Sequence, residues 1–324
     1  MNETPLDTSA LVNTPATLIG VPLNLGANNM GVEMGPNAYR WQDIVAKLGR
    51  AGLDVHDAGN VFCDERWNVS RSDNPKLHYL QEILRVSEDT AKLTETAVRD
   101  GRKAIVLGGD HSICLGAVSG ASSALQGQSL GLIYFDAHGD MCTAETTPSG
   151  NIHGMQLASL MGFGAAELAQ VHGEQVKVVP ANVLHIGGSD FDQAELDLIK
   201  QENLQAFTLD DMLRGGMAPV FPLIDALAAR VDNVWISLDL DCIDVQYAPA
   251  AGMPNSKGLL YREIKTLATY VGQHCNVVGI DVVEYNPLND IERKTASLAT
   301  ELIANFLGHE YSWYTEYLAR NPAS

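Results

Sequence analysis

The stretch that most constrains the fold of this chain is an apolar run that ends abruptly in charged residues. Leu130–Phe135 reads Leu-Gly-Leu-Ile-Tyr-Phe, and Asp136, His138 and Asp140 follow it. Continuous apolar runs of this length are typical of buried strands in parallel sheets. Residues two positions apart share one face of a strand, so two carboxylates and an imidazole would converge on one point at its end. Buried carboxylates need a cation or hydrogen-bond donors, and oxygen ligands combined with imidazole are the composition of a metal site.

Similar apolar runs recur along the chain and alternate with helical patterns. The predicted strands are residues 16–21, 53–59, 103–107, 130–135, 183–186, 205–208, 234–238 and 277–283. The predicted helices are residues 37–52, 75–100, 113–124, 153–161, 194–202, 219–230, 261–270 and 291–307. This alternation indicates βαβ units, so we predict an α/β protein with three layers (α/β/α) and a mainly parallel sheet of about eight strands. A closed barrel is the alternative, and we favour the open sheet because the candidate metal ligands follow only some of the strands.

Length and charge constrain the domain organisation and the partners. The 324 residues contain no internal repeat or linker, so we predict one domain over residues 15–324 after a flexible N-terminal tail over residues 1–14. The formal net charge of −19 argues against nucleic acid and anionic membranes as partners and is compatible with a cationic substrate, although solubility is the simpler explanation. The chain has no apolar stretch of membrane-helix length, no basic signal region, and five scattered cysteines, so we expect a cytoplasmic location.

Charged and imidazole side chains also follow two other predicted strands. His111 lies in Gly-Gly-Asp-His-Ser after residues 103–107, and Asp239 and Asp241 follow residues 234–238. The carboxyl ends of parallel strands meet at one edge of a sheet, so these side chains would join the three described above. Four carboxylates cannot gather in a dry site without cations, and one divalent ion does not need six ligands. We therefore predict a dinuclear site that suits Mn²⁺, with Fe²⁺, Co²⁺, Ni²⁺ and Zn²⁺ as alternatives.

Four motifs resemble the signatures of the ureohydrolase family, which includes arginases, agmatinases and related guanidino-compound hydrolases. They are Gly-Gly-Asp-His-Ser at 108–112, Asp-Ala-His-Gly-Asp at 136–140, Ser-Leu-Asp-Leu-Asp at 237–241 and Glu-Tyr-Asn-Pro at 284–287. The resemblance extends from about residue 16 to residue 308. It is closest to arginase, because the loop Thr-Thr-Pro-Ser-Gly-Asn-Ile-His-Gly at 146–154 is similar to the arginase version. The resemblance implies a three-layer α/β fold and two Mn²⁺ ions per subunit.

The resemblance also implies a role for each matching side chain. One metal ion would be held by His111, Asp136, Asp140 and Asp239. The other would be held by His138, Asp136, Asp239 and Asp241, so that Asp136 and Asp239 bridge the two ions. The substrate's α-carboxylate would be approached by Thr147, Ser149 and Asn151, and its α-amino group would lie near Asp192.

Several substrate-facing positions depart from the arginase pattern. Cys142 stands where arginases commonly have an asparagine that contacts the carboxylate. Met253 stands where the family usually has a threonine near the guanidinium, Val245 replaces a usual proline, and Asn29-Met30 replaces a basic residue followed by glycine. A thiol is a poor hydrogen-bond donor and a methionine side chain is apolar. These departures bear on the identity of the substrate rather than on the chemistry.

The expected activity is that of a dinuclear manganese amidinohydrolase, which cleaves a guanidino group to urea and an amine. L-Arginine would give L-ornithine and urea, and the alternative substrates are guanidinobutyrate, guanidinopropionate and N-hydroxyarginine. The nucleophile would be a hydroxide that bridges the metals, because metal ions lower the pKa of bound water towards about 7. Asp140 would orient this hydroxide, Glu284 would accept two hydrogen bonds from the guanidinium, and His153 would carry a proton to the departing amine. The family also implies a homo-oligomer, either a trimer or a hexamer.

Other interpretations of these residues remain open. A two-metal phosphoesterase is disfavoured because Arg and Lys are absent around the metal segments, and a non-enzymatic binding module would be expected to have lost ligands. Purely structural roles also exist for individual residues: Asp110 and Asp192 would cap helices, Glu284 would cap a turn, and His153 would be a satisfied loop histidine. Cys142 would then be a pocket wall or simply buried.

Overall fold

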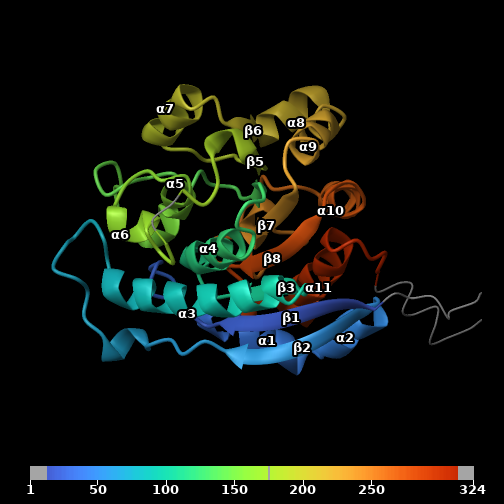
Figure 1. Cartoon of the computed structure of the whole chain (residues 1–324), viewed down its shortest axis with the longest axis horizontal. Helices are drawn as coiled ribbons and strands as arrows, with labels where there is room; N and C mark the ends of the chain where they lie inside the picture. The colour runs from blue at the N-terminus through green and yellow to red at the C-terminus, as the bar shows by residue number, and fades with distance from the viewer. Residues whose placement is uncertain (1–12, 174–175, 313–324) are drawn as a thin grey trace, which may run out of the picture.

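The computed structural model describes residues 13–173 and 176–312, and a single parallel sheet runs through them (Figure 1). Its strands are β1 (Thr14–Val21), β2 (Leu53–Asn60), β3 (Lys103–Gly108), β4 (Leu130–Phe135), β5 (Val183–Ile186), β6 (Gln205–Phe207), β7 (Asn233–Asp239) and β8 (Val277–Val283). They are arranged in the order β2-β1-β3-β8-β7-β4-β5-β6, and each neighbouring pair is parallel. The sheet is open, with β2 and β6 at its edges. The predicted open sheet of eight strands is therefore confirmed, and the alternative of a closed barrel is wrong.

Helices cover both faces of the sheet and complete the predicted three layers. One face is covered by α3 (Leu80–Arg99), α4 (Cys114–Ala124), α5 (Gln156–Leu160), α6 (Ala166–Ala169) and α7 (Gln193–Gln201). The other face is covered by α1 (Gly35–Trp41), α2 (Ile44–Arg50), α8 (Leu209–Gly215), α9 (Val220–Ala228), α10 (Tyr261–His274) and α11 (Lys294–Phe306). Right-handed crossovers between parallel strands place helices on both faces in this way.

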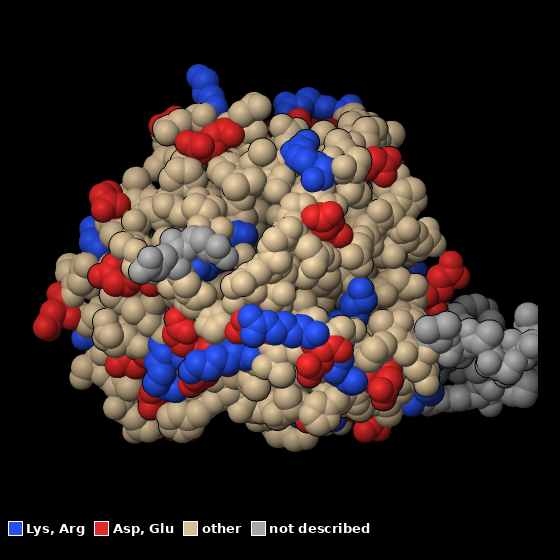
Figure 2. Space-filling model, viewed as in Figure 1, with Lys and Arg blue, Asp and Glu red and all other residues tan. Residues whose placement is uncertain are grey.

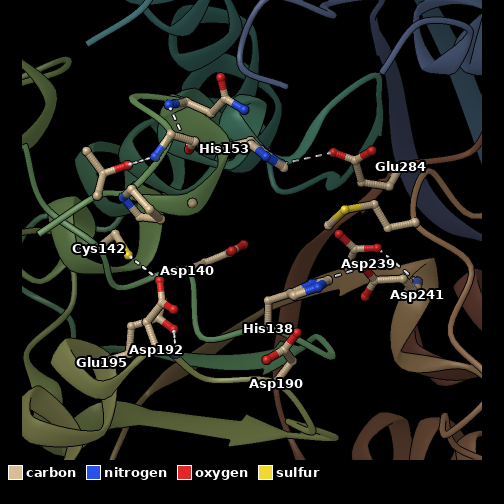
Figure 3. Close-up of a pocket in the computed structure, with 16 residues that line it drawn as sticks. His138, Asp140, Cys142, His153, Asp190, Asp192, Glu195, Asp239, Asp241 and Glu284 are labelled. Atoms are coloured by element: carbon tan, nitrogen blue, oxygen red, sulfur yellow. Dashed lines mark hydrogen bonds and ion pairs between the residues drawn. The ribbon is translucent and has the colours of Figure 1, made fainter. Parts of the chain in front are cut away.

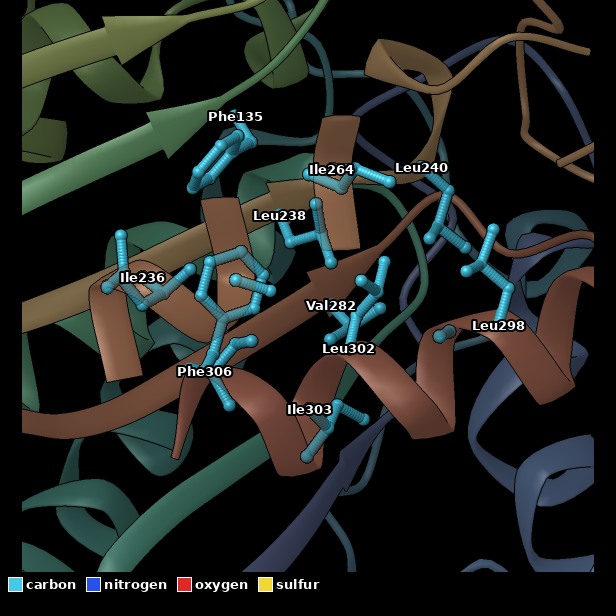
Figure 4. Close-up of a cluster of buried hydrophobic side chains, with 14 of the residues drawn as sticks. Phe135, Ile236, Leu238, Leu240, Ile264, Val282, Leu298, Leu302, Ile303 and Phe306 are labelled. Carbon is cyan, nitrogen blue, oxygen red and sulfur yellow. The ribbon is translucent and has the colours of Figure 1, made fainter. Parts of the chain in front are cut away.

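Each central strand sends alternate side chains into two separate hydrophobic cores. In β4, Ile133 and Phe135 belong to one core, whereas Leu132 and Tyr134 belong to the core on the opposite face. Figure 4 shows the first core, where strands β4, β7 and β8 meet helices α10 and α11. The ring centroids of Phe135 and Phe306 lie 5.2 Å apart in this core. Burial on both faces explains why these strands read as unbroken apolar runs rather than as alternating patterns.

Some element boundaries differ from those expected from the sequence. The helix expected over residues 37–52 is two helices, because Asp43 takes a left-handed backbone conformation with φ of 59° between α1 and α2. Strand β1 begins at Thr14, inside the expected N-terminal tail, and residues 1–12 of that tail lie outside the described residues. Helix α8 was not expected at all. The assignment of residues 15–324 to one domain stays a prediction.

Acidic and basic side chains are interspersed on the face of the molecule shown in Figure 2. Along α3, Arg85 forms an ion pair with Asp64 at 2.8 Å, and Arg99 forms one with Glu95 at 2.5 Å. Pairing of this kind leaves these guanidinium groups poorly placed to form a phosphate-binding patch. Within the described part of the chain, each helix is too short or too polar to cross a lipid bilayer.

Candidate active site

Four neighbouring strands in the middle of the sheet deliver the candidate residues at their carboxyl ends. Strand β3 is followed by His111 and β8 by Glu284. Strand β7 ends in Asp239 and is followed by Asp241, and β4 is followed by Asp136, His138 and Asp140. In the parallel register, Leu238 of β7 lies opposite Phe135 of β4. The aspartates that follow these two residues therefore reach the same level of the sheet. This arrangement agrees with the general rule that open α/β sheets bind ligands beyond the carboxyl ends of their strands.

Three carboxylates surround one nitrogen of the buried His111 imidazole. Its Nδ1 atom lies 2.9 Å from Asp136 Oδ2 and 3.2 Å from both Asp140 Oδ2 and Asp239 Oδ2. The adjacent Asp110 caps the turn that begins at His111, because its Oδ1 accepts a hydrogen bond from the backbone of Ser112 at 3.0 Å. The structural role considered for Asp110 is therefore present, and it holds His111 in place.

A second group of the same composition adjoins the first. His138 Nδ1 lies 3.4 Å from Asp136 Oδ1 and 3.1 Å from Asp241 Oδ2. In each group the candidate ligand atoms of three residues lie within 4.8 Å of one another, and Asp136 belongs to both groups, the first of which includes His111 and Asp239. The two groups therefore share one carboxylate, which offers a separate oxygen to each histidine.

The hydrogen bonds on the far side of His111 determine which of its ring nitrogens can bind a metal ion. Its Nε2 atom lies 2.9 Å from Ser237 Oγ, and Ser237 donates its own proton to Asp281 Oδ1 at 2.7 Å. Trp235 Nε1 donates to the other oxygen of Asp281 at 2.6 Å. Because the Ser237 proton is used in this way, its oxygen accepts from Nε2, so Nδ1 is the nitrogen that can lose its proton and offer a lone pair to a metal ion. This is the usual arrangement of a histidine that binds a metal ion.

The electrostatics of the two groups also favour a bound cation. Burial, together with the neighbouring Asp140 and Asp241 carboxylates, raises the pKa of Asp136 to about 7. Burial and the same kind of repulsion raise the pKa of Asp239 well above its usual range. Burial opposes a charged His138, but the hydrogen bonds to Asp136 and Asp241 outweigh it and raise its pKa. Positive charge is therefore strongly favoured here, and carboxylate oxygens combined with imidazole nitrogens suit divalent transition metals.

Two carboxylate residues of the site, Asp140 and Glu284, have a left-handed backbone conformation. Asp140 has a φ of 55° and Glu284 a φ of 61°. Aspartate tolerates this left-handed conformation better than most residues, whereas glutamate seldom adopts it. Gly252 approaches the Glu284 carboxylate so closely that any Cβ at position 252 would collide with it. Other non-glycine residues of the described chain also have a positive φ, but only Asp140 and Glu284 among them line the cavity.

Glu284 and His153 form a pair across the cavity, which Figure 3 shows. Glu284 Oε1 accepts a hydrogen bond from the backbone of His111 at 3.0 Å and lies 3.6 Å from His153 Nδ1. Burial opposes protonation of His153, but the Glu284 carboxylate outweighs it and raises the pKa of His153 to about 9. The cap-like contact considered for Glu284 is thus present, and its carboxylate also faces the cavity.

The opposite side of the cavity in Figure 3 is formed by Cys142, Asp192 and Glu195. Asp192 is the N-cap residue of α7, and Glu195 Oε2 accepts a hydrogen bond from its backbone at 2.8 Å. The Cys142 thiol donates to Asp192 Oδ2 at 3.6 Å. Burial, with the Glu195 and Asp192 carboxylates nearby, raises the pKa of this thiol to about 12. Cys142 therefore stays protonated, and its proton is directed to Asp192.

The loop between β4 and α5 supplies hydroxyl groups to the same cavity. Thr147 Oγ1 accepts hydrogen bonds from the backbone of Ser149 at 3.3 Å and of Gly150 at 3.0 Å, and Ser149 Oγ accepts one from the backbone of Asn151 at 3.2 Å. Because both hydroxyl oxygens act as acceptors within the loop, their protons are left to donate to a ligand. Met253, with 41% of its surface exposed, lies at the cavity rim.

All fourteen residues predicted from the sequence meet at this site. Twelve of them line a cavity of about 270 Å³, which suits a small substrate, and His111 and Asp136 lie directly behind it. The lining residues are His138, Asp140, Cys142, Thr147, Pro148, Ser149, Asn151, His153, Gly154, Asp190, Asp192, Glu195, Asp239, Asp241, Met253 and Glu284. Among these described residues, no Lys or Arg lines the cavity, which therefore suits a cation far better than a phosphate.

Four residues that contact the site were missed in the sequence. Glu195 is the third residue of α7, and an Asp-x-x-Glu spacing before a helix is a readable capping signal. Asp190 lines the cavity beside His138, to which it is joined by a backbone bridge. Tyr134 lies two residues before Asp136 and so shares its face of the strand, and Gln156 reaches Asp140 from α5.

Comparisons with known proteins show the family to which the chain belongs. The model of the arginase family matches residues 14–308. The chain is 38% identical to the arginase of Brevibacillus brevis over 298 residues, which cover 92% of this chain and 99% of that relative. The solved structure of Bacillus caldovelox arginase has a TM-score of 0.87 at 36% identity, covering 92% of this chain and all of that one. Bacillus cereus arginase gives a TM-score of 0.85 at 35% identity, covering 93% of this chain and all of that one. The chain therefore belongs to the arginase family and is a ureohydrolase, an enzyme that hydrolyses linear amidines.

Proposed function

We propose that this enzyme hydrolyses L-arginine to L-ornithine and urea and uses two Mn²⁺ ions in each subunit. The observation that carries the proposal is that carboxylates stand at both ends of the cavity. Glu284 stands at one side of the cavity, and Asp192 and Glu195 stand at the other. Beside Glu284 lies the histidine–aspartate cluster, which consists of His111, Asp136, His138, Asp140, Asp239 and Asp241. A substrate with a guanidinium at one end and an ammonium at the other would place a cation against carboxylates at both ends.

The histidine–aspartate cluster would hold the metal ions in this proposal. One ion would be held by His111, Asp136, Asp140 and Asp239, and the other by His138, Asp136, Asp239 and Asp241. The chemistry that bound divalent cations supply is hydroxide near neutral pH, because they lower the pKa of water. Ligands of the cluster that are already fixed by hydrogen bonds, such as His111 through Ser237, need little reorganisation on binding.

Glu284 and His153 would handle the guanidino group and its proton. The Glu284 carboxylate can accept two parallel hydrogen bonds from the guanidinium, and the bond from the backbone of His111 holds that carboxylate in place. His153 is protonated at neutral pH because its pKa is raised to about 9 by Glu284, after the opposing effect of burial. A guanidinium bound to Glu284 would weaken this pairing and repel the imidazolium. His153 would then release its proton more readily to the departing amine.

The amino-acid end of the substrate would meet two kinds of groups. The α-ammonium would lie against the carboxylate of Asp192, whose position at the start of α7 is fixed by Glu195. The α-carboxylate would accept hydrogen bonds from the hydroxyl groups of Thr147 and Ser149 and from the amide of Asn151. Neutral donors of this kind bind a carboxylate without placing a fixed positive charge beside the metal cluster.

A second candidate substrate is another guanidino acid, such as guanidinobutyrate, guanidinopropionate or N-hydroxyarginine. The observation that favours it is the hydrogen bond of Cys142 to Asp192, because a thiol used in this way does not donate to a substrate carboxylate. Met253 adds an apolar group at the rim of the cavity. Both features weaken recognition of an ordinary amino-acid head group while leaving the metal cluster intact, which favours guanidinobutyrate and guanidinopropionate over N-hydroxyarginine, since the last keeps that head group.

The cellular setting of the enzyme is also part of the proposal. All five cysteines are free thiols, as expected in a reducing compartment, which supports a cytoplasmic location. Membership of the arginase family supports a homo-oligomer, either a trimer or a hexamer.

The test is release of urea by the Mn²⁺-loaded enzyme from a panel of substrates. The panel contains L-arginine, agmatine, L-homoarginine, N-hydroxyarginine, guanidinobutyrate and guanidinopropionate. The highest kcat/KM is expected for L-arginine. A higher value for guanidinobutyrate, guanidinopropionate or N-hydroxyarginine would replace the leading proposal with the second, and absence of urea from all six would overturn both. An Asp192→Asn variant should lose activity on L-arginine but not on guanidinobutyrate, since only the former has an ammonium at that position.

A further inference from the structure

Tyr134 reaches the histidine–aspartate cluster with its hydroxyl group. Its ring is completely buried and stacks on the imidazole of His111, with centroids 4.8 Å apart and planes 5° from parallel. Its Oη atom donates to Asp140 Oδ2 at 2.7 Å and lies 3.2 Å from His111 Nδ1. A tyrosine in a hydrophobic core is usually a space-filling residue, but this hydroxyl touches two candidate metal ligands at once.

Gln156 completes this arrangement from the start of α5. Its side chain is also fully buried, and its amide nitrogen donates to Tyr134 Oη at 2.9 Å and also to Asp140 Oδ2. Its amide oxygen accepts a hydrogen bond from the backbone of Met155 at 3.1 Å. Both protons of the amide and its oxygen are therefore in use, and the side chain is held in one orientation.

The two side chains act on the same oxygen of Asp140. A buried carboxylate oxygen that receives two donors cannot exchange places with its partner oxygen without breaking both hydrogen bonds. Oδ2 is also the Asp140 oxygen that lies 3.2 Å from His111 Nδ1, the nitrogen that faces the other carboxylates of the cluster. Its orientation therefore affects the side of the cluster where His111, Asp136 and Asp239 converge.

We propose that Tyr134 and Gln156 are positioning residues, which together hold Asp140 Oδ2 against His111 and so set the geometry of one of the two metal-binding groups. The inference deepens the proposed function, because it depends on Asp140 being a metal ligand. Hydrogen-bonding partners of metal ligands commonly contribute 10-fold to 100-fold to metal affinity or activity, and a buried pair of donors on one ligand oxygen belongs to that class. Neither residue touches the cavity, so neither acts on the substrate directly.

The first variant for testing this role is Tyr134→Phe, which removes the hydroxyl but keeps the ring that stacks on His111. The second is Gln156→Met, which keeps the shape of the side chain and removes its donors. The metal-free proteins are titrated with Mn²⁺ alone, by calorimetry and by the loss of the electron paramagnetic resonance signal of free Mn²⁺. We expect one of the two Mn²⁺ sites to weaken by about 10-fold to 100-fold in each variant while the other changes little. In turnover assays, kcat should fall and KM should stay within about twofold.

Tyr39→Phe is the matched control. Tyr39 is equally buried, its hydroxyl has no hydrogen-bond partner in the described part of the chain, and its ring packs on Tyr285 at 4.7 Å, away from the cluster. This variant removes the same atom and should bind Mn²⁺ like the wild type.

The outcomes separate this inference from the proposed function. Wild-type Mn²⁺ affinity in a folded Tyr134→Phe or Gln156→Met protein would overturn it, as would equal weakening in the Tyr39→Phe control or a change confined to KM. If Tyr134→Phe does not fold, as judged by circular dichroism, Gln156→Met decides. Because Mn²⁺ binding is measured without any substrate, failure of the arginine proposal leaves this result unaffected, whereas a wild-type protein that does not bind Mn²⁺ would overturn both.

Discussion

Loading the metal-free enzyme with Mn²⁺ should release protons, and the affinity should therefore rise steeply with pH. The carboxylates around His111 and His138 raise the pKa values of both imidazoles in spite of their burial, so both rings are positively charged near pH 7 in the metal-free enzyme. Burial and its carboxylate neighbours raise the pKa of Asp136 to about 7, so this group is half protonated at that pH. A metal ion binds only the neutral imidazole and the ionised carboxylate, and binding must displace these protons.

The size of the effect follows from counting those groups. The two imidazoles release one proton each, Asp136 releases roughly half, and Asp239, whose pKa is also raised well above its usual range by burial and its carboxylate neighbours, adds to this, so about 2.5 protons or more should leave each subunit near pH 7. The share of Asp136 approaches about one proton near pH 6, where it is mostly protonated, and falls towards zero near pH 8, where it is ionised. Since protons are lost on binding, a higher pH favours the loaded state, and the overall association constant should rise by about 2.5 orders of magnitude or more per pH unit near pH 7.

Calorimetry in buffers with different ionisation enthalpies measures this number directly. At fixed pH, the slope of apparent binding enthalpy against buffer ionisation enthalpy is the number of protons released. A His138→Ala variant should release about one proton fewer, because it lacks one of the two charged rings. His172→Gln is the control, since His172 pairs with Glu88 and Glu95 on α3 and contacts none of these groups. Release of less than one proton per subunit, or an affinity that is constant between about pH 6 and pH 8, would show that the charge balance described for this cluster is wrong.

Three further predictions concern Glu284, Cys142 and the core. Glu284→Gln should reduce urea formation by ~100-fold. It should also lower the pKa of His153 from about 9 towards its usual 6.5, which NMR titration of the metal-free protein measures. An unchanged His153 titration midpoint would contradict its pairing with Glu284. Because that folded-state pKa is raised, the pair stabilises the fold fully below about pH 6.5 and ceases to do so as pH rises through about 9, so the Tm difference between wild type and variant should shrink over this interval. Cys142→Asn should lower KM for L-arginine by about threefold to tenfold, the worth of one added hydrogen bond, and an unchanged KM would identify Cys142 as no more than a wall of the cavity. Phe306→Ala should lower the unfolding free energy by ~3–5 kcal/mol in chemical denaturation, whereas the exposed Leu213→Ala should change it by less than about 0.5 kcal/mol, and similar losses in both would refute the assigned core.

The sheet and the candidate metal ligands could be predicted because both follow from short-range patterns. Buried parallel strands produce apolar runs, and the limits of residues 130–135, 183–186 and 277–283 agree with β4, β5 and β8. Charged residues directly after such runs must lie along one edge of the sheet, and the order β3-β8-β7-β4 brings those of the site together. The positions of Asp136 and His111 therefore required no knowledge of side-chain packing.

Features that depend on side chains meeting in three dimensions were not predictable. Nothing in the residues around Asp43 signals a break, since neither Gly nor Pro stands there, yet tertiary packing turns the chain between α1 and α2. Helix α8 could have been found, because Thr208 and Asp211 form a capping box before it. The contact of Tyr134 and Gln156 with one oxygen of Asp140 joins residues from a strand, a helix and a loop, and their spacing carries no sign of it.

The left-handed backbone at Asp140 and Glu284 lowers the stability of the fold at two positions that the proposed reaction needs. Each such residue costs on the order of 1–3 kcal/mol, which the native fold must absorb. Glycine would relieve that cost at either position, but it would also delete a carboxylate that the proposed reaction requires. Efforts to make this enzyme more heat-resistant therefore have to leave these two positions alone and work on the helices and loops remote from the cavity.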